Sequence, residues 1–178
     1  MLRTLCGALV VLTFVVPARA ADDEVDLGGM KAKAPAAWKA GKPASSMQVA
    51  TFTLPKTDGD PEDAQVIVYF FGQGGGGGVD ANVKRWQQMF KAPAGEKSKT
   101  DSLKVGDAKV TTVDVQGTYL SRFPPFDPNA KVTEKPDFRL IGVVFENPKG
   151  PYFIRFVGPQ KTVDKYKNDF DAWLKSFK

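Results

Sequence analysis

The feature that most constrains the fold is an uninterrupted run of six apolar residues, Val66-Ile67-Val68-Tyr69-Phe70-Phe71. A strand with one face in water alternates apolar and polar side chains, whereas this run is apolar at both parities. Such a pattern is typical of a strand that is covered on both faces. The run therefore predicts a central strand of a sheet, with a layer of structure above it and another below it.

Two amphipathic helices can supply those layers. Apolar side chains recur every three or four residues in two segments, which indicates a helix with one apolar side in each. The first helix is expected over about 80–91 and the second near the C-terminus. Their apolar stripes are Val79, Val83, Trp86 and Phe90, and then Val163, Tyr166, Phe170, Trp173 and Phe177.

Further strands are expected where apolar and polar residues alternate between turn residues. They fall at 27–34, 47–54, 97–104, 109–119, 139–146 and 152–157. Short turns between consecutive strands favour antiparallel pairing, and both apolar helix stripes need a sheet face to cover. The expected fold class is therefore α+β: a mainly antiparallel sheet flanked by two amphipathic helices, an αβα sandwich.

The N-terminus has the pattern of an export signal. A basic start, Met1-Leu2-Arg3, precedes an apolar stretch from Leu5 to Val16 and the small-residue motif Ala18-Arg19-Ala20. This order predicts a signal peptide over 1–20, cleaved between Ala20 and Ala21. The expected location is periplasmic or secreted. The apolar stretch is too short to span a bilayer comfortably, and no later segment is apolar enough, so no membrane insertion is expected after cleavage.

The remaining residues, 21–178, suit a single α+β domain with one core. Two segments are expected to lie outside its regular structure. Residues 21–26 are mostly acidic and are expected to form a disordered leader. Residues 121–137 contain Pro124, Pro125, Pro128 and Pro136 and are expected to form a Pro-rich loop, because proline fixes φ and lacks an N–H group.

The composition of the chain limits the reactions and partners that can be expected of it. The chain has no histidine, and its one cysteine, Cys6, lies in the expected signal peptide. These side chains serve most nucleophile–base pairs and most zinc sites, so catalysis is disfavoured and neither a metal nor a cofactor is expected. The net charge is +5, and loss of Arg3 and Arg19 lowers 25 basic residues to 23 against 20 acidic ones, or +3. Lysines are scattered among acids, so nucleic acid is not an expected partner.

Three residues are candidate ligand-binding positions: Asn82, Arg85 and Arg155. Asn82 and Arg85 lie on the first predicted helix, directly after a glycine run at 74–78. Backbone N–H groups of a glycine loop before a helix can attract anions, but no Gly-Lys-Ser/Thr follows, and a flexible or tightly turned connection is the alternative. Arg155 interrupts an apolar strand, so it either points outward, pairs with Asp114 or Glu146, or meets a bound anion.

The acidic residues offer a second set of hypotheses. Asp58, Asp60, Glu62 and Asp63 lack the glycine and distal glutamate of a helix–loop–helix calcium site. A hydrolase that pairs carboxylates would need acids such as Asp114 and Glu146 in one cleft, and no spacing selects them. The leading hypothesis is an exported, non-catalytic binding or accessory domain of the bacterial cell envelope, with an envelope protein as one candidate partner. The alternative is a small hydrolase or carbohydrate-active domain that uses Asp or Glu.

A resemblance agrees with the leading hypothesis. The segments that carry it are the strand 47–54, Pro35-x-x-Trp38, Tyr69-Phe70-Phe71-Gly72, Asn82-x-x-Arg85-Trp86, Gly117-Thr118-Tyr119 and Gly150-Pro151-Tyr152-Phe153. Together they resemble an uncharacterised family of exported bacterial proteins that is common in planctomycetes. The Pro-x-x-Trp motif and the strand–helix order also resemble the PsbP-type fold, named for an extrinsic subunit of photosystem II. The resemblance implies a sheet flanked by helices and mostly non-catalytic binding roles, and it supplies no catalytic residues.

Overall fold

A computed structural model describes residues 23–91, 98–123 and 129–178 of the chain. Its strands and helices follow one another along these residues as β1 (Glu24–Leu27), β2 (Met30–Lys33), β3 (Lys39–Gly41), β4 (Gln48–Leu54), β5 (Ala64–Phe70), α1 (Val79–Gln87), β6 (Ser98–Val105), β7 (Ala108–Phe123), β8 (Lys131–Asn147), β9 (Gly150–Pro159) and α2 (Gln160–Lys175). The expected signal peptide and its Ala20–Ala21 cleavage site lie outside the described residues. Among the helices that are described, none is long and apolar enough to cross a membrane.

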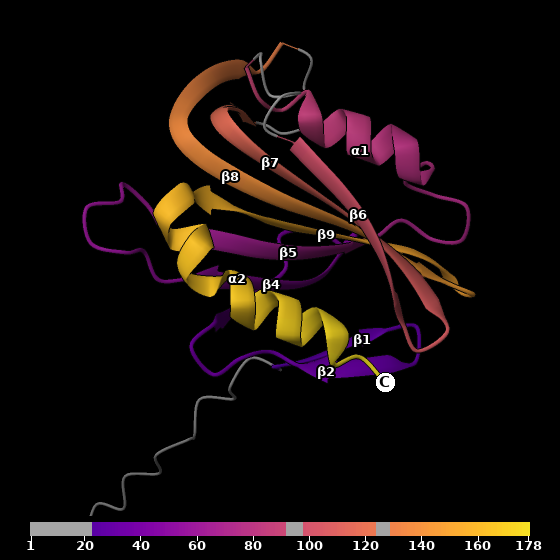
Figure 1. Ribbon diagram of the computed structural model, residues 1–178. Helices are drawn as coiled ribbons and strands as arrows, with labels where there is room; N and C mark the ends of the chain where they lie inside the picture. The colour runs from indigo at the N-terminus through magenta and orange to yellow at the C-terminus, as the bar shows by residue number, and fades with distance from the viewer. Residues whose placement is uncertain (1–22, 92–97, 124–128) are drawn as a thin grey trace, which may run out of the picture.

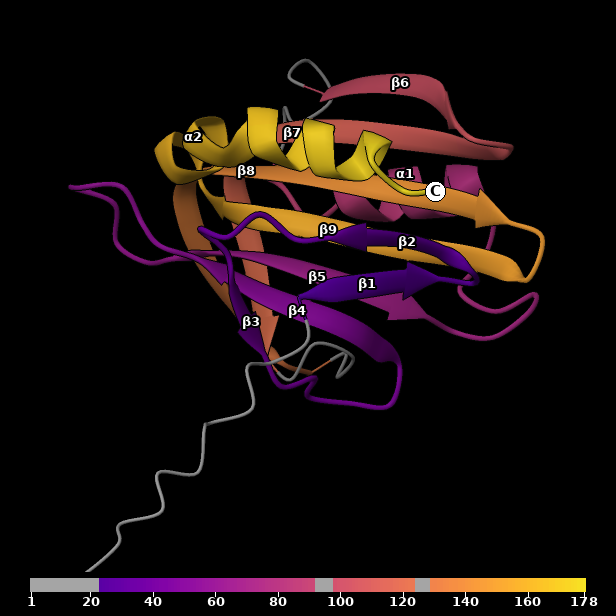
Figure 2. The same ribbon diagram turned by 90° about the horizontal axis from the view of Figure 1, so that it is seen from below.

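The main sheet has the strand order β3-β4-β5-β9-β8-β7-β6, and every neighbouring pair within it is antiparallel. Figure 1 shows α1 and α2 on opposite faces of this sheet, and Figure 2 shows the small β1–β2 hairpin on the same side as α2. The structure therefore confirms the α+β class with an antiparallel sheet between two helices.

Each helix covers its own hydrophobic cluster. The cluster under α2 contains Phe170 and Trp173 of the helix together with inward-facing residues of the central strands, such as Phe156 and Phe145. The cluster under α1 is smaller and contains Trp86, Phe153 and Leu140. Successive side chains of a strand point to opposite faces, so the central strands β8 and β9 supply both clusters.

The N-terminal segment corrects one expectation. Residues 24–26 belong to β1 rather than to a disordered leader, and Val25 pairs with Ala32 of β2. Val25 and Leu27 are fully buried, whereas the acidic Glu24 and Asp26 alternate with them on the exposed side. The chain end holds the hairpin in place, because the Lys31 N–H donates to the Lys178 carbonyl at 2.9 Å. The acidic composition therefore concealed an amphipathic strand.

The Pro-rich loop is a second correction. β7 continues to Phe123 and β8 begins at Lys131, so only part of 121–137 lies outside strands; residues 124–128 are not among those described. Pro136 is accommodated because the pairing of β7 and β8 shifts register between Gly117 and Tyr119. A bulge of this kind needs no ladder hydrogen bond from its extra residue, so proline is tolerated there.

Candidate binding face on the sheet

One half of the α1 side of the sheet has no helix over it. α1 packs on β7 and β8 and leaves β4 and β5 without a described helix on that side (Figures 1 and 2). Cross-strand partners share a face, so the pairing identifies the side chains on this half of the sheet. We call it the open sheet face, and it consists of Lys39, Gly41, Thr51, Thr53, Gln65, Ile67, Tyr69, Arg155 and Val157.

The structure confirms that the middle of the run 66–71 is covered on both faces, because Ile67 on the α1 side is only 7% exposed. Val66 and Val68 are buried under the α2 layer, but Tyr69 and Phe71 on the other parity are only half-buried. The rings of these two residues are nearly parallel, at 4°, with centroids 5.9 Å apart. Both rings also pack against the cluster under α1, so this end of the run is covered incompletely on that side.

Arg155 lies on β9, at the edge of this face that borders β8, without a carboxylate partner among the described residues. It pairs across the sheet with Ile67 on one side and Gly142 on the other. Its Nη2 donates to the Tyr69 hydroxyl at 3.1 Å, and its Cζ lies 5.6 Å from the centroid of the Tyr69 ring. Its Nε is buried and has no hydrogen-bond partner. Of the alternatives raised by the sequence, neither Asp114 nor Glu146 forms an ion pair with this guanidinium.

Asn82 and Arg85 organise the glycine loop. The Asn82 side chain is buried, and its Nδ2 donates to the carbonyls of Gly76 at 2.9 Å and Gly78 at 3.0 Å. The exposed Arg85 donates from Nη1 to the Asn82 Oδ1 at 2.7 Å. The loop is therefore a tightly turned connection whose carbonyls are held by the Asn82 side-chain amide, and α1 begins at Gly78 without a side-chain cap.

The glycine loop borders the open sheet face through aromatic rings. Gly76 has φ of 80°, and a Cβ added to it would lie 2.4 Å from the ring of Phe153. Phe153 in turn contacts Phe71, with centroids 5.7 Å apart, and Phe71 stacks beside Tyr69. Asn82, through the glycine loop, and Arg155, through Tyr69, therefore lie at opposite ends of one row of aromatic side chains, whereas Arg85 contacts Asn82.

The acids proposed for a hydrolase lie apart. Asp114 is on the α2 side of the sheet, where both its oxygens accept hydrogen bonds from Arg139, Nε at 2.9 Å and Nη2 at 2.5 Å. Arg139 also pairs with Asp164 of α2, and these carboxylates, Asp114 first, raise the pKa of Arg139. Glu146 has the parity of Val144, which belongs to the α1 side. Asp114 and Glu146 therefore face opposite sides of the sheet.

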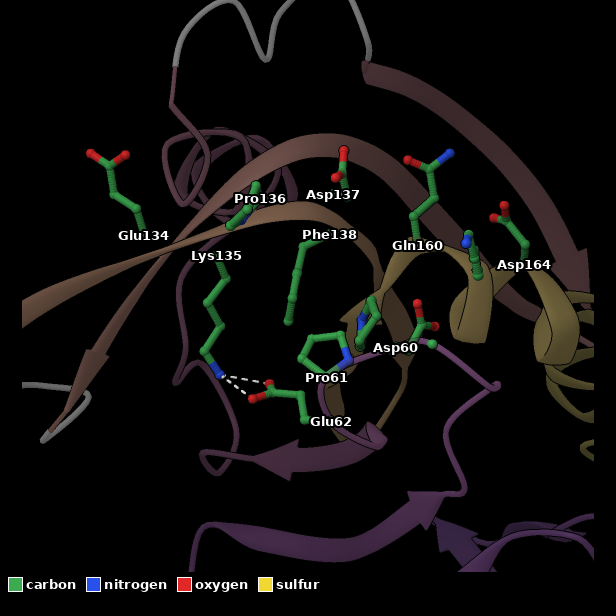
Figure 3. Close-up of a pocket in the computed structure, with 13 residues that line it drawn as sticks. Asp60, Pro61, Glu62, Glu134, Lys135, Pro136, Asp137, Phe138, Gln160 and Asp164 are labelled. Atoms are coloured by element: carbon green, nitrogen blue, oxygen red, sulfur yellow. Dashed lines mark hydrogen bonds and ion pairs between the residues drawn. The ribbon is translucent and has the colours of Figure 1, made fainter.

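A groove of about 730 Å³ lies between the turn 59–62, the bulged start of β8 and the first turn of α2 (Figure 3). It does not touch the glycine loop. Several of its acids bind neighbouring protein groups: Glu62 accepts from Lys135 at 2.6 Å, and Glu134 accepts from Lys91 at 2.9 Å. Asp60 accepts from the Thr162 N–H at 2.9 Å and from the Thr162 hydroxyl at 2.6 Å.

The four acids once considered for calcium do not converge. Asp60 and Glu62 bind the separate partners just described, and the Asp63 Oδ1 accepts from the Lys56 N–H at 2.9 Å. Among the described residues, no group of three or more metal-ligating side chains comes together. The turn is built by hydrogen bonds to protein groups.

Asp60 is expected to stabilise the fold by capping α2 across 102 positions of sequence. We predict that Asp60→Ala lowers the free energy of unfolding by about 2 kcal/mol, because the helix loses its cap and two buried donors lose their acceptor. Urea unfolding of the purified protein measures this. Asp58→Ala, in the same turn but exposed, is the control and should change stability by less than about 0.5 kcal/mol. Equal values for the two variants would contradict the assigned cap.

Comparisons with known proteins give a likeness of fold and no family. No protein-family model matches this chain, and no curated protein matches it in sequence. The solution structure of the cyanobacterial PsbP protein from Synechocystis is similar with a TM-score of 0.49 and 14% identity, over 97% of this chain and 99% of that chain. A protein of unknown function from Pseudomonas aeruginosa gives 0.44 and 11%, over 86% and 93%. The PsbP-type resemblance is thus present as a distant likeness, and no residue's role is transferred from either protein.

Proposed function

We propose that this protein is an exported, non-catalytic binding or accessory domain of the bacterial cell envelope, and that it binds its partner through the open sheet face. The observation that carries the proposal is Arg155. This guanidinium is held by Tyr69 on a sheet face without a described helix over it, and it has no carboxylate partner in the described chain. Arginine and tyrosine are the side chains that dominate many binding surfaces.

Three further features support the proposal. The export pattern at 1–20 is typical of chains that are directed to the periplasm or outside the cell. The segments quoted above resemble a planctomycete-type family of exported proteins. Tyr69 and Phe71 at the end of the apolar run are also only half-buried on the α1 side, which leaves apolar surface for a partner. Asn82 and Arg85 belong to the proposal as the residues that shape the adjoining loop.

The proposal is tested on protein recovered from the cell envelope of the organism that makes it. Mass spectrometry should find an N-terminus at Ala21, and the purified mature chain should turn over no ester, glycoside or phosphate substrate above the blank. Turnover that is lost in Asp114→Asn at an unchanged melting temperature would establish the hydrolase alternative instead. No observation favours that alternative at present, because Asp114 is bound by Arg139 and Glu146 faces the other side of the sheet.

A further inference from the structure

We infer that the open sheet face binds an acidic protein segment, with one partner carboxylate at Arg155 and another at Lys39. The inference rests on the proposed function and adds the chemistry of the partner to it. It follows from the state of the Arg155 guanidinium, from the charges on the face and from the distance between its two cations.

The guanidinium of Arg155 is held in place by Tyr69, and some of its N–H groups have no acceptor among the described residues. One Nη2 hydrogen bond goes to the Tyr69 hydroxyl, while the ring of the same tyrosine holds the guanidinium against the sheet. Nη1 has no acceptor among the described residues. Arginine pairs with carboxylates through two parallel N–H groups, so an incoming carboxylate completes the set. Because Tyr69 already restricts the side chain, less conformational entropy is lost when the carboxylate binds.

The charges of the face select an acidic partner. Of its nine residues only Lys39 and Arg155 are charged, and neither is paired with an acid in the described structure. Some cations elsewhere in the sheet and helices are paired with acids, such as Arg139 with Asp114 and Asp164 and Lys167 with Asp171. An acid-free face with two cations attracts a partner of opposite sign and repels a basic one.

The spacing favours an extended chain over a small anion. Lys39 is on β3 and Arg155 is on β9, with β4 and β5 between them. From the spacing of neighbouring strands and the rise along them, the two Cα atoms are about 15 Å apart. One small anion cannot contact both cations at that distance. Between them lie the half-buried Tyr69, Thr51 and Thr53, which offer apolar and hydrogen-bonding contacts to the side chains of a peptide. Ile67 beside them is only 7% exposed and supports them from below.

The test measures binding of a labelled peptide of alternating glutamate and valine to the mature protein by fluorescence anisotropy. Arg155→Gln should weaken binding about tenfold or more, since a hydrogen bond to a charged group contributes about 1.5–3 kcal/mol. Lys39→Gln should weaken it about two- to threefold, as expected for an exposed charge. Arg122→Gln on β7 and Lys175→Gln on α2 remove one exposed charge each elsewhere and should change affinity less than twofold. A lysine–valine peptide should not bind.

A second variant tests the face without changing Arg155, in case Arg155→Gln disturbs the fold. Thr53→Glu puts an acid on the same face, beside Lys39 in the pairing, and should abolish binding of the acidic peptide. Melting temperatures of all variants establish that they are folded. Equal losses in Arg155→Gln and Arg122→Gln would overturn the inference, because net charge alone would explain binding. No binding by the wild type would overturn it too, as would tighter, Arg155-dependent binding of dextran sulfate, which would assign the face to a polysaccharide.

The proposed function could still be correct if the inference about the acidic partner is wrong. If an envelope protein co-purifies equally with the wild type and with the Arg155→Gln/Lys39→Gln variant, the protein is a binding domain whose partner sits elsewhere. If peptide binding depends on Arg155 but the mature chain also turns over a substrate, the face binds acids and the non-catalytic assignment is wrong.

Discussion

Gly142→Ala is expected to lower the free energy of unfolding by about 3 kcal/mol, the upper part of the usual range for overpacking. Gly142 lies on β8 directly beneath the indole of Trp86. A Cβ at this position would lie 2.3 Å from the Trp86 Cε3 and 2.6 Å from its Cδ2. Trp86 is buried in the smaller cluster, so the ring can move away only if α1 moves with it. Glycine is required here because a helix side chain approaches the strand backbone closely.

Chemical denaturation followed by far-ultraviolet circular dichroism measures the effect. Gly78→Ala is the matched control, because Gly78 has φ of −74° and no atom within 4 Å of an added Cβ. The free energy of unfolding of that variant should fall by less than about 1 kcal/mol, the usual difference between glycine and alanine at the start of a helix. A Gly142→Ala protein as stable as the Gly78→Ala protein would contradict the described packing of α1.

Arg139→Gln is expected to lower the free energy of unfolding by about 2–3 kcal/mol, somewhat below the range for a fully buried pair. The guanidinium joins β7, β8 and α2 through Asp114 and Asp164, and its side chain is only 12% exposed. Removing it leaves the Asp114 carboxylate, 24% exposed, without its two hydrogen bonds. Asp164 is 47% exposed and is solvated more easily, which places the expected loss below the full range.

A second substitution distinguishes the effect of losing the Arg139 hydrogen bonds from the effect of losing its side-chain volume. Arg139→Lys keeps the charge but cannot form the two parallel hydrogen bonds, so its loss should lie between those of the wild type and Arg139→Gln. In a protein that already carries Asp114→Asn, Arg139→Gln should lower the free energy of unfolding by a smaller amount. The reason is that residue 114 then has no charge that could be left unpaired. Additive losses in the double variant would show that the two side chains are not coupled.

The elements with strong local patterns could be predicted from the sequence. The C-terminal helix, the strands at 47–54 and 109–119 and the hairpin turn between β8 and β9 lie at nearly their predicted positions. The first helix begins where predicted but ends at Gln87 and not near 91, because Phe90 bridges to Tyr119. The apolar spacing of these elements is local, and so is the turn chemistry between them. β1 was missed because its four residues are too few to show an alternation against an acidic background. The start of β8 was missed because its proline sits in a bulge, which only pairing with β7 creates.

The candidate site could be predicted only in part. Arg155 was identified because a charge within an apolar strand is conspicuous, and Asn82 with Arg85 because they follow the glycine run. Tyr69 as the partner of Arg155 is 86 positions away, and nothing local indicates the contact. The contact between Asp60 and Thr162 of α2 is likewise distant in sequence and has no local signal. The partial exposure of Tyr69 and Phe71 could not be predicted either, because an apolar run is the same in sequence whether its side chains are fully or half-buried.

Site-specific photo-crosslinking in the living cell tests the central claim most directly. A photoreactive residue placed at Thr53, on the open sheet face, should crosslink to one discrete envelope protein, and Arg155→Gln should remove that product. The same residue at Lys175, on the exposed side of α2, should give no such product. A crosslink from Lys175 with none from Thr53, or a Thr53 product that Arg155→Gln leaves unchanged, would contradict the account.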